Sequence, residues 1–193
     1  MPVLFIDFET TGLNVFHDDV IDYSIREKDT GYSVSSLVKL EKKQKVSNFI
    51  TGLTGITDEM LKDAQNPKEA IKSMVDFIDA HSSRRDKVTL VAHNGDSFDF
   101  ILLKRMMNDY NIHPKFKMQY FDTLRFTQKL TTRFYRYNQP NLCKIFKVKN
   151  EAEHRASGDT KSLEEIYKHL AKMYSTKKST IDDHINYTYN GIR

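Results

Sequence analysis

The chain has 193 residues, of which 39% are hydrophobic and 29% charged, so it carries enough apolar material for one packed domain and wholesale disorder is excluded. No uninterrupted apolar run is longer than four residues, which excludes a membrane-spanning helix of about 20 residues. The 30 basic side chains outnumber the 26 acidic ones and give a net charge of +4, a balance that suits a polyanionic partner.

The cysteine count and the first residues bear on the compartment. Cys143 is the single cysteine, so the chain forms no internal disulfide, as is typical of a reducing compartment. Met1 and Pro2 lead directly into an apolar segment, without a basic leader or a cleavable apolar stretch. We therefore expect an intracellular protein, cytoplasmic or nuclear, that is neither secreted nor held in a membrane.

The first forty residues predict three strands. Val3–Glu9 is rich in apolar residues and has the length of a buried strand. Val20–Lys28 and Tyr32–Leu40 flank Asp29-Thr30-Gly31, a turn sequence typical of a β-hairpin. We expect these two later strands to be antiparallel.

The rest of the chain alternates helices with strands. Pro67–His81 carries its apolar residues on one helical face, and Phe98–Tyr110 and Asp159–Met173 are the next predicted helices. Val88–His93 and Met118–Phe121 are short predicted strands.

Three strands followed by alternating helices and strands predict an α/β fold, with a mixed five-stranded sheet flanked by helices. We assign residues 1–175 to one domain and residues 176–193 to a C-terminal tail of uncertain structure.

Two acidic residues, Asp7 and Glu9, end the first predicted strand. Side chains alternate along a strand, so both carboxylates point to one face. Neighbouring carboxylates repel each other and resist joint ionisation unless a cation compensates them. Two interpretations follow: a metal-binding pair, or acids exposed in a solvated turn.

Two further acids stand at the starts of helices. Asp99 follows the strand that ends at His93, and Asp159 follows Ser157 in the sequence. Each has a structural explanation, because an acid in the first turn favours the helix dipole, with Asp96 or Ser157 as the N-cap. Taken singly, such acids are more often caps than ligands.

The four acids gain weight together, because α/β sheets place their sites at strand ends and helix starts. Their four negative charges would balance two Mg²⁺ ions, which prefer oxygen ligands. Two such ions can activate a water and stabilise the leaving oxygen of an in-line phosphoryl displacement. His154, five residues before Asp159, then suits a general base, because an unperturbed imidazole titrates near neutrality.

Three segments resemble the exonuclease motifs of the DnaQ-like (DEDDh) superfamily of 3′–5′ exonucleases: FIDFETTGL at residues 5–13, HNGDSFD at 93–99 and HRASGD at 154–159. Their order and spacing cover nearly the whole domain. Within the superfamily the chain is most similar to the three-prime repair exonucleases, through LVAHNGD at 90–96 and ITGL at 50–53.

The resemblance implies a ribonuclease-H-like fold and the removal of nucleotides from a 3′ end. Four acids would hold two Mg²⁺ or Mn²⁺ ions: Asp7, Glu9, Asp99 and Asp159. His154 would deprotonate the attacking water. Substrate contacts are implied for Glu9 and Thr10 at the terminal 3′ hydroxyl, for Leu13 and Ile50 against the last bases, and for His93 and Asn94 along the scissile nucleotide.

Two features depart from the three-prime repair exonucleases. Ser97 stands where an arginine is usual beside the metal-binding acid, which bears on contacts with phosphate. No proline-rich insertion precedes His154, which bears on partner binding. Members of the family often pair through an edge strand, so the resemblance also implies a homodimer as one form of assembly.

Two clusters of basic residues allow two interpretations, a solvated face or a track for a nucleic-acid backbone. One cluster precedes the segment at 50–53 and contains Lys39, Lys42, Lys43 and Lys45. The other recurs at helical spacing and contains Arg125, Lys129, Arg133 and Arg136. Thr123, just before the second cluster, is either part of a further family segment or a helix cap.

We predict a metal-dependent 3′→5′ exonuclease that hydrolyses phosphodiester bonds of DNA and releases mononucleotides, with two Mg²⁺ ions and with His154 as general base. Its partner would be nucleic acid with a free 3′ end. One alternative is a 3′→5′ exoribonuclease, because the pocket around Glu9, Thr10 and Leu13 decides the sugar. A catalytically idle nucleic-acid-binding module and a proofreading subunit of a polymerase are the others.

Overall fold

The computed structural model describes residues 2–41, 45–82, 87–150 and 154–175 of the chain. The predicted tail at 176–193 lies outside these residues, as do Lys42 and Lys43 of the first basic cluster. In the part of the chain that is described, no helix has the length and apolar character needed to cross a bilayer.

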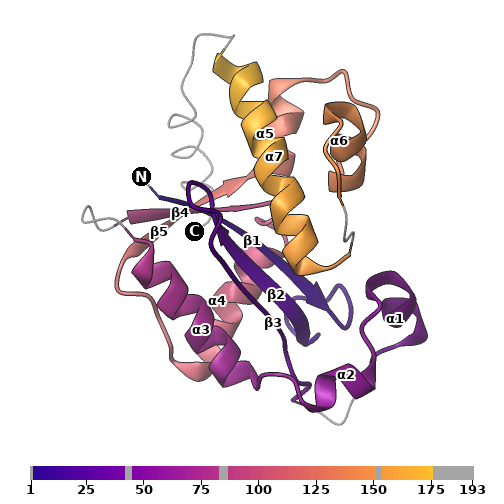
Figure 1. Ribbon diagram of the computed structural model, residues 1–193, viewed down its shortest axis with the longest axis vertical. Coiled ribbons are helices and arrows are strands. Elements are labelled where there is room, and N and C mark those ends of the chain that lie inside the picture. Colours follow the sequence, from indigo (N-terminus) through magenta and orange to yellow (C-terminus); the bar gives the residue numbers. More distant parts are fainter. Residues whose placement is uncertain (1, 42–44, 83–86, 151–153, 176–193) are drawn as a thin grey trace.

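A five-stranded sheet forms the centre of the fold, and this confirms the predicted mixed sheet (Figure 1). Its strands are β1 (Val3–Thr10), β2 (Val20–Glu27), β3 (Ser33–Leu37), β4 (Lys87–Ala92) and β5 (Lys117–Asp122). Their order across the sheet is β3-β2-β1-β4-β5. The β1–β2 and β2–β3 pairs are antiparallel, whereas β4 runs parallel to both β1 and β5. The predicted hairpin at Asp29-Thr30-Gly31 joins β2 to β3, with Gly31 in a left-handed conformation at φ 72°.

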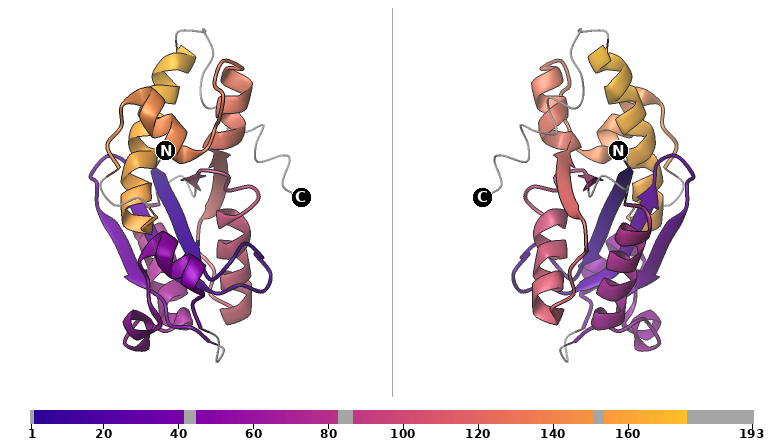
Figure 2. Two further views of the ribbon diagram at one scale, coloured as in Figure 1. Left: turned by 90° about the vertical axis from the view of Figure 1, so that its right-hand side faces the viewer. Right: turned by 90° about the vertical axis from the view of Figure 1, so that its left-hand side faces the viewer.

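Seven helices are described around the sheet: α1 (Asn48–Thr54), α2 (Asp58–Lys62), α3 (Pro67–Ala80), α4 (Asp99–Tyr110), α5 (Thr123–Leu130), α6 (Gln139–Phe146) and α7 (Ala156–Ser175). Figure 2 shows α5, α6 and α7 gathered at one end of the molecule, with α1, α2, α3 and α4 toward the other. The three predicted helices correspond to α3, α4 and α7, each within a few residues of its expected bounds.

Two hydrophobic cores lie on opposite faces of the sheet because side chains alternate along each strand. Leu4, Ile6 and Phe8 of β1 pack with residues of α3 and α4 in the larger core. Val3 and Phe5 face the other way and pack with residues of α5, α6 and α7. The ring of Phe5 meets that of Tyr167 edge-on at 5.5 Å between centroids. This alternation sends the side chains at positions 7 and 9 toward α7.

Short helices are the main departure from the predicted elements. α1 has seven residues and α2 has five, too few for a recognisable helical repeat, and both are stabilised by burying Ile50 and Leu61 in a satellite core. α6 was not predicted either. α5 ends at Leu130, so Arg133 and Arg136 lie on the following loop, and the four residues of the second basic cluster do not share one helix.

Candidate active site

Three of the predicted ligands converge at the end of β1. One carboxylate oxygen from each of Asp7, Glu9 and Asp159 lies within 4.8 Å of the others. The first two residues belong to β1 and the third to the first turn of α7. The structure therefore favours the metal-site interpretation of the strand-end acids over the solvated-turn interpretation, because the pair is part-buried against a helix.

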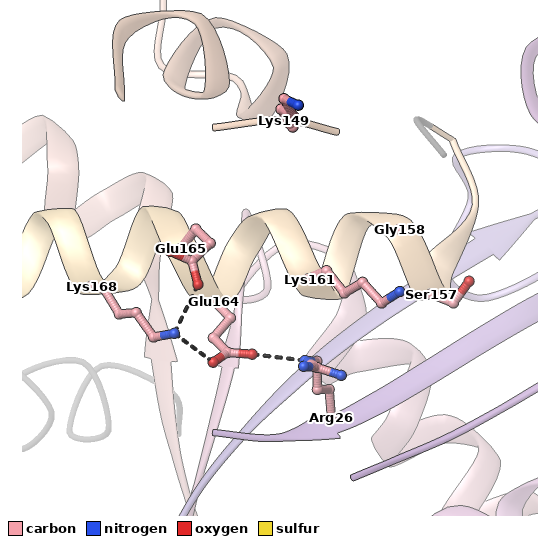
Figure 3. A pocket seen from close by; sticks show the side chains of 8 residues that line it. All are labelled: Arg26, Lys149, Ser157, Gly158, Lys161, Glu164, Glu165 and Lys168. Atoms are coloured by element: carbon pink, nitrogen blue, oxygen red, sulfur yellow. Dashed lines mark hydrogen bonds and ion pairs between the residues drawn. The ribbon is translucent and has the colours of Figure 1, made fainter. Parts of the chain in front are cut away.

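Polar contacts hold α7 across the sheet so that Asp159 reaches β1. The hydroxyl oxygens of Ser24 on β2 and Thr160 on α7 are 3.0 Å apart in a buried hydrogen bond. Further along the helix, Arg26 Nε donates to Glu164 Oε2 at 2.7 Å (Figure 3). Both contacts join α7 to the strand next to β1, so they fix the helix over the β1–β2 pair.

The fourth predicted ligand, Asp99, lies at the start of α4 with 3% of its surface exposed. Its Oδ1 accepts a hydrogen bond from the backbone N–H of Phe8 at 3.2 Å, so the carboxylate faces β1. The capping interpretation is wrong for this helix, because its N-cap is Phe98 and no side chain caps it. Asp96 instead forms an ion pair with Arg125 at 2.9 Å.

Neighbouring carboxylates add to the effect of burial on the pKa values of Asp7 and Glu9. Burial, followed by the charges of Asp99 and Asp159, raises the pKa of Asp7 well above its usual value. Burial and then the Asp159 carboxylate raise the pKa of Glu9 to about 8. Burial also raises the pKa of Asp99 to about 7. The site offers only carboxylate oxygens, which are the ligands that hard divalent cations prefer. A bound cation would offset the repulsion between these carboxylates and favour their ionised forms.

The predicted base, His154, stands two residues before α7 in a left-handed backbone conformation with φ 62°. Residues other than glycine rarely adopt this conformation, and such strain is often held at functional sites. α7 begins at Ala156, so Ser157 lies inside the first turn, and its predicted role as N-cap is wrong.

Asp22 and Arg155 belong to the site region but were not predicted. Asp22 pairs with Glu9 in the antiparallel register of β1 and β2. It accepts a hydrogen bond from Arg155 Nε at 2.9 Å and another from the backbone N–H of Ala156. Burial raises the pKa of Asp22 and the Arg155 pairing opposes that rise. This anchor holds the residue that follows His154 against β2.

A second unpredicted residue, Asp122, supports the turn that leads to Asp99. It is fully buried and accepts from the backbone N–H groups of Asn94 and Asp96, each at 3.1 Å. It also caps α5, a role that the sequence had offered to Thr123. The turn approaches α4 closely, because a Cβ on Gly95 would lie 2.6 Å from the Phe100 ring.

The predicted substrate contacts differ in exposure. Leu13 is 89% exposed directly after β1, as a surface contact requires. Ile50 is 9% exposed and packs in the satellite core with Ile21 and Ile56, so little of its side chain is open to a base, and its contact with the last bases stays a prediction. The exposed apolar residue next to it on α1 is Phe49, at 75%.

Some of the polar residues predicted to contact the substrate already form hydrogen bonds within the protein. The Thr10 hydroxyl donates to the carbonyl of Gly12. His93 Nδ1 lies 2.9 Å from Thr123 Oγ1, and that hydroxyl donates to the carbonyl of Ala92. Because the hydroxyl has one proton, the imidazole is the donor in the first contact. Asn94 is exposed, in a left-handed conformation with φ 66°.

A separate pocket of about 460 Å³ borders α7 without including the carboxylate cluster (Figure 3). Its lining contains Arg26, Lys149, Ser157, Gly158, Lys161, Glu164, Glu165 and Lys168. Glu164 pairs there with both Arg26 and Lys168, which ties the helix to β2.

Comparisons with known proteins point the same way as the geometry. A family model described as "Exonuclease" (RNase_T) matches residues 4–167. DNA polymerase III PolC-type of Mycoplasma genitalium is 30% identical over 93% of this chain and 12% of its own length. The PolC-type enzyme of Streptococcus pyogenes is 31% identical over 81% of this chain and 10% of its own length. The chain thus spans about a tenth of the length of these relatives.

Among solved structures, Escherichia coli exonuclease I in complex with a dT13 oligonucleotide has a TM-score of 0.77 and 14% sequence identity, covering 91% of this chain and 42% of that one. Another exonuclease I structure has a TM-score of 0.75 over 98% of this chain and 43% of that one, at 14% identity. At such identity the likeness concerns the fold, and it agrees with the five-stranded sheet and its helices. The relatives named here are PolC-type polymerases, so the specific likeness to three-prime repair exonucleases stays a prediction.

Proposed function

Because this chain belongs to the exonuclease family (RNase_T) of the DnaQ-like superfamily, we propose that it removes nucleotides from the 3′ end of DNA by metal-dependent hydrolysis. The convergence of Asp7, Glu9 and Asp159, with Asp99 facing the same strand, is the observation that carries the proposal. Ionising several neighbouring carboxylates with raised pKa values is electrostatically unfavourable. Divalent cations would offset this repulsion at the place where a phosphodiester would react.

DNA is the favoured substrate. The relatives are DNA polymerases by name, and the exonuclease I neighbour was solved with a DNA oligonucleotide. A proofreading role is the corresponding proposal for the biological setting, because the chain is similar to a segment of PolC-type polymerases.

The four acids would hold two Mg²⁺ ions, with Mn²⁺ as a substitute. When bound, these ions supply positive charge for an in-line displacement at phosphorus. Asp7 lies on β1 and Asp159 on α7, so two packed elements hold the site rigid. Asp99 adds a buried charge whose orientation is set by the Phe8 amide.

His154 would act as general base. A neutral imidazole can accept the proton of the attacking water, and later release it to solvent. Its backbone is held in position by the next residue, Arg155, whose guanidinium is anchored on Asp22 at 2.9 Å. Leu13, exposed directly after β1, would pack against the terminal base, while Glu9 and Thr10 would lie at the 3′ hydroxyl.

The test uses two oligonucleotides, one DNA and one RNA, each labelled at the 5′ end and incubated with Mg²⁺ or with EDTA. We expect a Mg²⁺-dependent ladder that shortens from the 3′ end and forms faster on DNA. Asp7→Asn should abolish it, and His154→Ala should lower kcat by about 10²–10⁴-fold, the usual contribution of a general base. Asp63→Asn and His113→Ala, at exposed positions, serve as matched controls.

Three outcomes would contradict parts of the proposal. A ladder from the 5′ end would overturn the polarity, and faster cleavage of RNA would favour the exoribonuclease. Tight binding of both oligonucleotides without any ladder would favour the idle binding module.

A further inference from the structure

Two amide side chains, Asn150 and Gln139, contact the carboxylate of Asp159. Asn150 Nδ2 donates to Asp159 Oδ1 at 2.8 Å. Gln139 Nε2 donates to the same oxygen at 3.3 Å and to the backbone carbonyl of Asp159 at 2.9 Å. Neither amide was singled out by the sequence, because they lie 9 and 20 residues from the acid they contact.

The side chain of Gln139 is buried and held by several hydrogen bonds. Gln139 is the first residue of α6, is 8% exposed, and also donates to Ser162 Oγ at 3.0 Å. Ser162 in turn donates its hydroxyl proton to the carbonyl of Asp159. The amide therefore joins α6 to the first turn of α7 at the residue that carries the predicted ligand.

The orientation of the Asn150 amide follows from its partner. A carboxylate oxygen is an acceptor, so the NH₂ group must face it, and the opposite orientation would set two acceptors against each other. An amide adds no charge to a site that already contains several acids. It restrains the carboxylate without competing with it for a cation.

We infer that Asn150 and Gln139 are positioning residues that orient Asp159 for a divalent cation. Both engage Oδ1, so rotation of the carboxylate is restrained, while one Asp159 carboxylate oxygen lies within 4.8 Å of a carboxylate oxygen of Asp7 and of Glu9. Outer partners of this kind tune metal affinity by about 10- to 100-fold in other metal sites. The inference rests on the proposed function, because it concerns the same metal site.

The experiment measures Mn²⁺ binding to the DNA-free protein by electron paramagnetic resonance, with free and bound Mn²⁺ distinguished by signal height. Asn150→Ala and Gln139→Ala should weaken Mn²⁺ binding by about 10- to 100-fold. Asn150→Asp keeps the shape but replaces the donor with a charged acceptor, and it should bind more weakly than Asn150→Ala. The Mg²⁺ concentration for half-maximal cleavage should rise, and kcat should recover at saturating Mg²⁺.

Matched controls and thermal unfolding in EDTA separate positioning from folding. Asn108→Ala on α4 and Gln128→Ala on α5 remove exposed amides and should leave Mn²⁺ binding unchanged. Wild-type Mn²⁺ affinity in Asn150→Ala and Gln139→Ala would overturn this inference alone. A loss of affinity only in variants that are already unfolded at the assay temperature would overturn it too. A wild-type protein that binds no Mn²⁺ would overturn the proposed function as well.

Discussion

The metal-free site should destabilise the fold, and Glu9→Gln measures by how much. The substitution removes one negative charge and keeps the shape of the side chain. Burial and neighbouring carboxylates raise the pKa of Glu9 from 4.5 to about 8. A raised carboxyl pKa favours the folded state below pH 4.5, and that contribution is lost as the pH rises through 8. The wild-type protein in EDTA should therefore lose stability over this window, and Glu9→Gln should lose less.

The size of the effect follows from the pKa. The rise in the pKa of Glu9 from 4.5 to about 8 corresponds to at most about 5 kcal/mol, at about 1.4 kcal/mol for each tenfold change in proton affinity. The repulsion is shared with Asp159, Asp22 and Asp99, so we expect about half, or about 2 kcal/mol, at pH 8. For a protein of this size, that is a gain of about 4–8 °C in Tm.

Thermal unfolding followed by circular dichroism in EDTA, at intervals from pH 5 to pH 8.5, tests this expectation. The difference in Tm between Glu9→Gln and wild type should be small at pH 5 and largest near pH 8. Added Mg²⁺ should stabilise wild type more than the variant. Glu59→Gln, at an exposed ion pair on α2, is the control. A Glu9→Gln protein that is less stable than wild type at pH 8 in EDTA would refute the reasoning.

Three further predictions concern the surroundings of the site. Gly95→Ala would place a Cβ 2.6 Å from the Phe100 ring, so it should cost about 1–3 kcal/mol in urea unfolding, and unchanged stability would contradict the tight turn. Arg155→Gln removes the ion pair with Asp22, and in the labelled-oligonucleotide assay it should change kcat, by lowering it, more than it changes KM. An unaltered kcat would contradict the proposal that Arg155 holds His154 in position. Leu13→Ser should raise KM for DNA several-fold and leave the Tm unchanged, because the side chain is 89% exposed. An equal loss of DNA affinity for 3′-blocked and free ends would count against contact with the terminal base.

The acidic residues of the site could be predicted from the sequence because each lies at a recognisable position in a predicted strand or helix. Asp7 and Glu9 end an apolar strand, where the two-residue period alone puts them on one face. Asp99 and Asp159 start helices, where the sequence allowed a cap or a ligand. For Asp99 the tertiary structure shows that no side chain caps the helix and that its carboxylate accepts from the Phe8 amide of β1, while its role as a metal ligand stays a prediction.

Other features had no local signal at all. The short helices α1 and α2 are too brief for a helical repeat, and burial of Ile50 in a separate core became evident only when they packed. Arg125 and Lys129 lie on α5, whereas Arg133 and Arg136 follow the end of this helix at Leu130, which the spacing of the basic residues did not indicate.

The sequence by itself determined the five strands, the three longest helices, the mixed sheet and the order of the acidic motifs, since these depend on residue periodicity and local spacing. The tertiary structure alone decided which distant groups meet. Asp22 reaches Glu9 through strand register, and Asn150 reaches Asp159 through the packing of α6 against α7. Such contacts arise from long-range packing, which no spacing along the chain encodes.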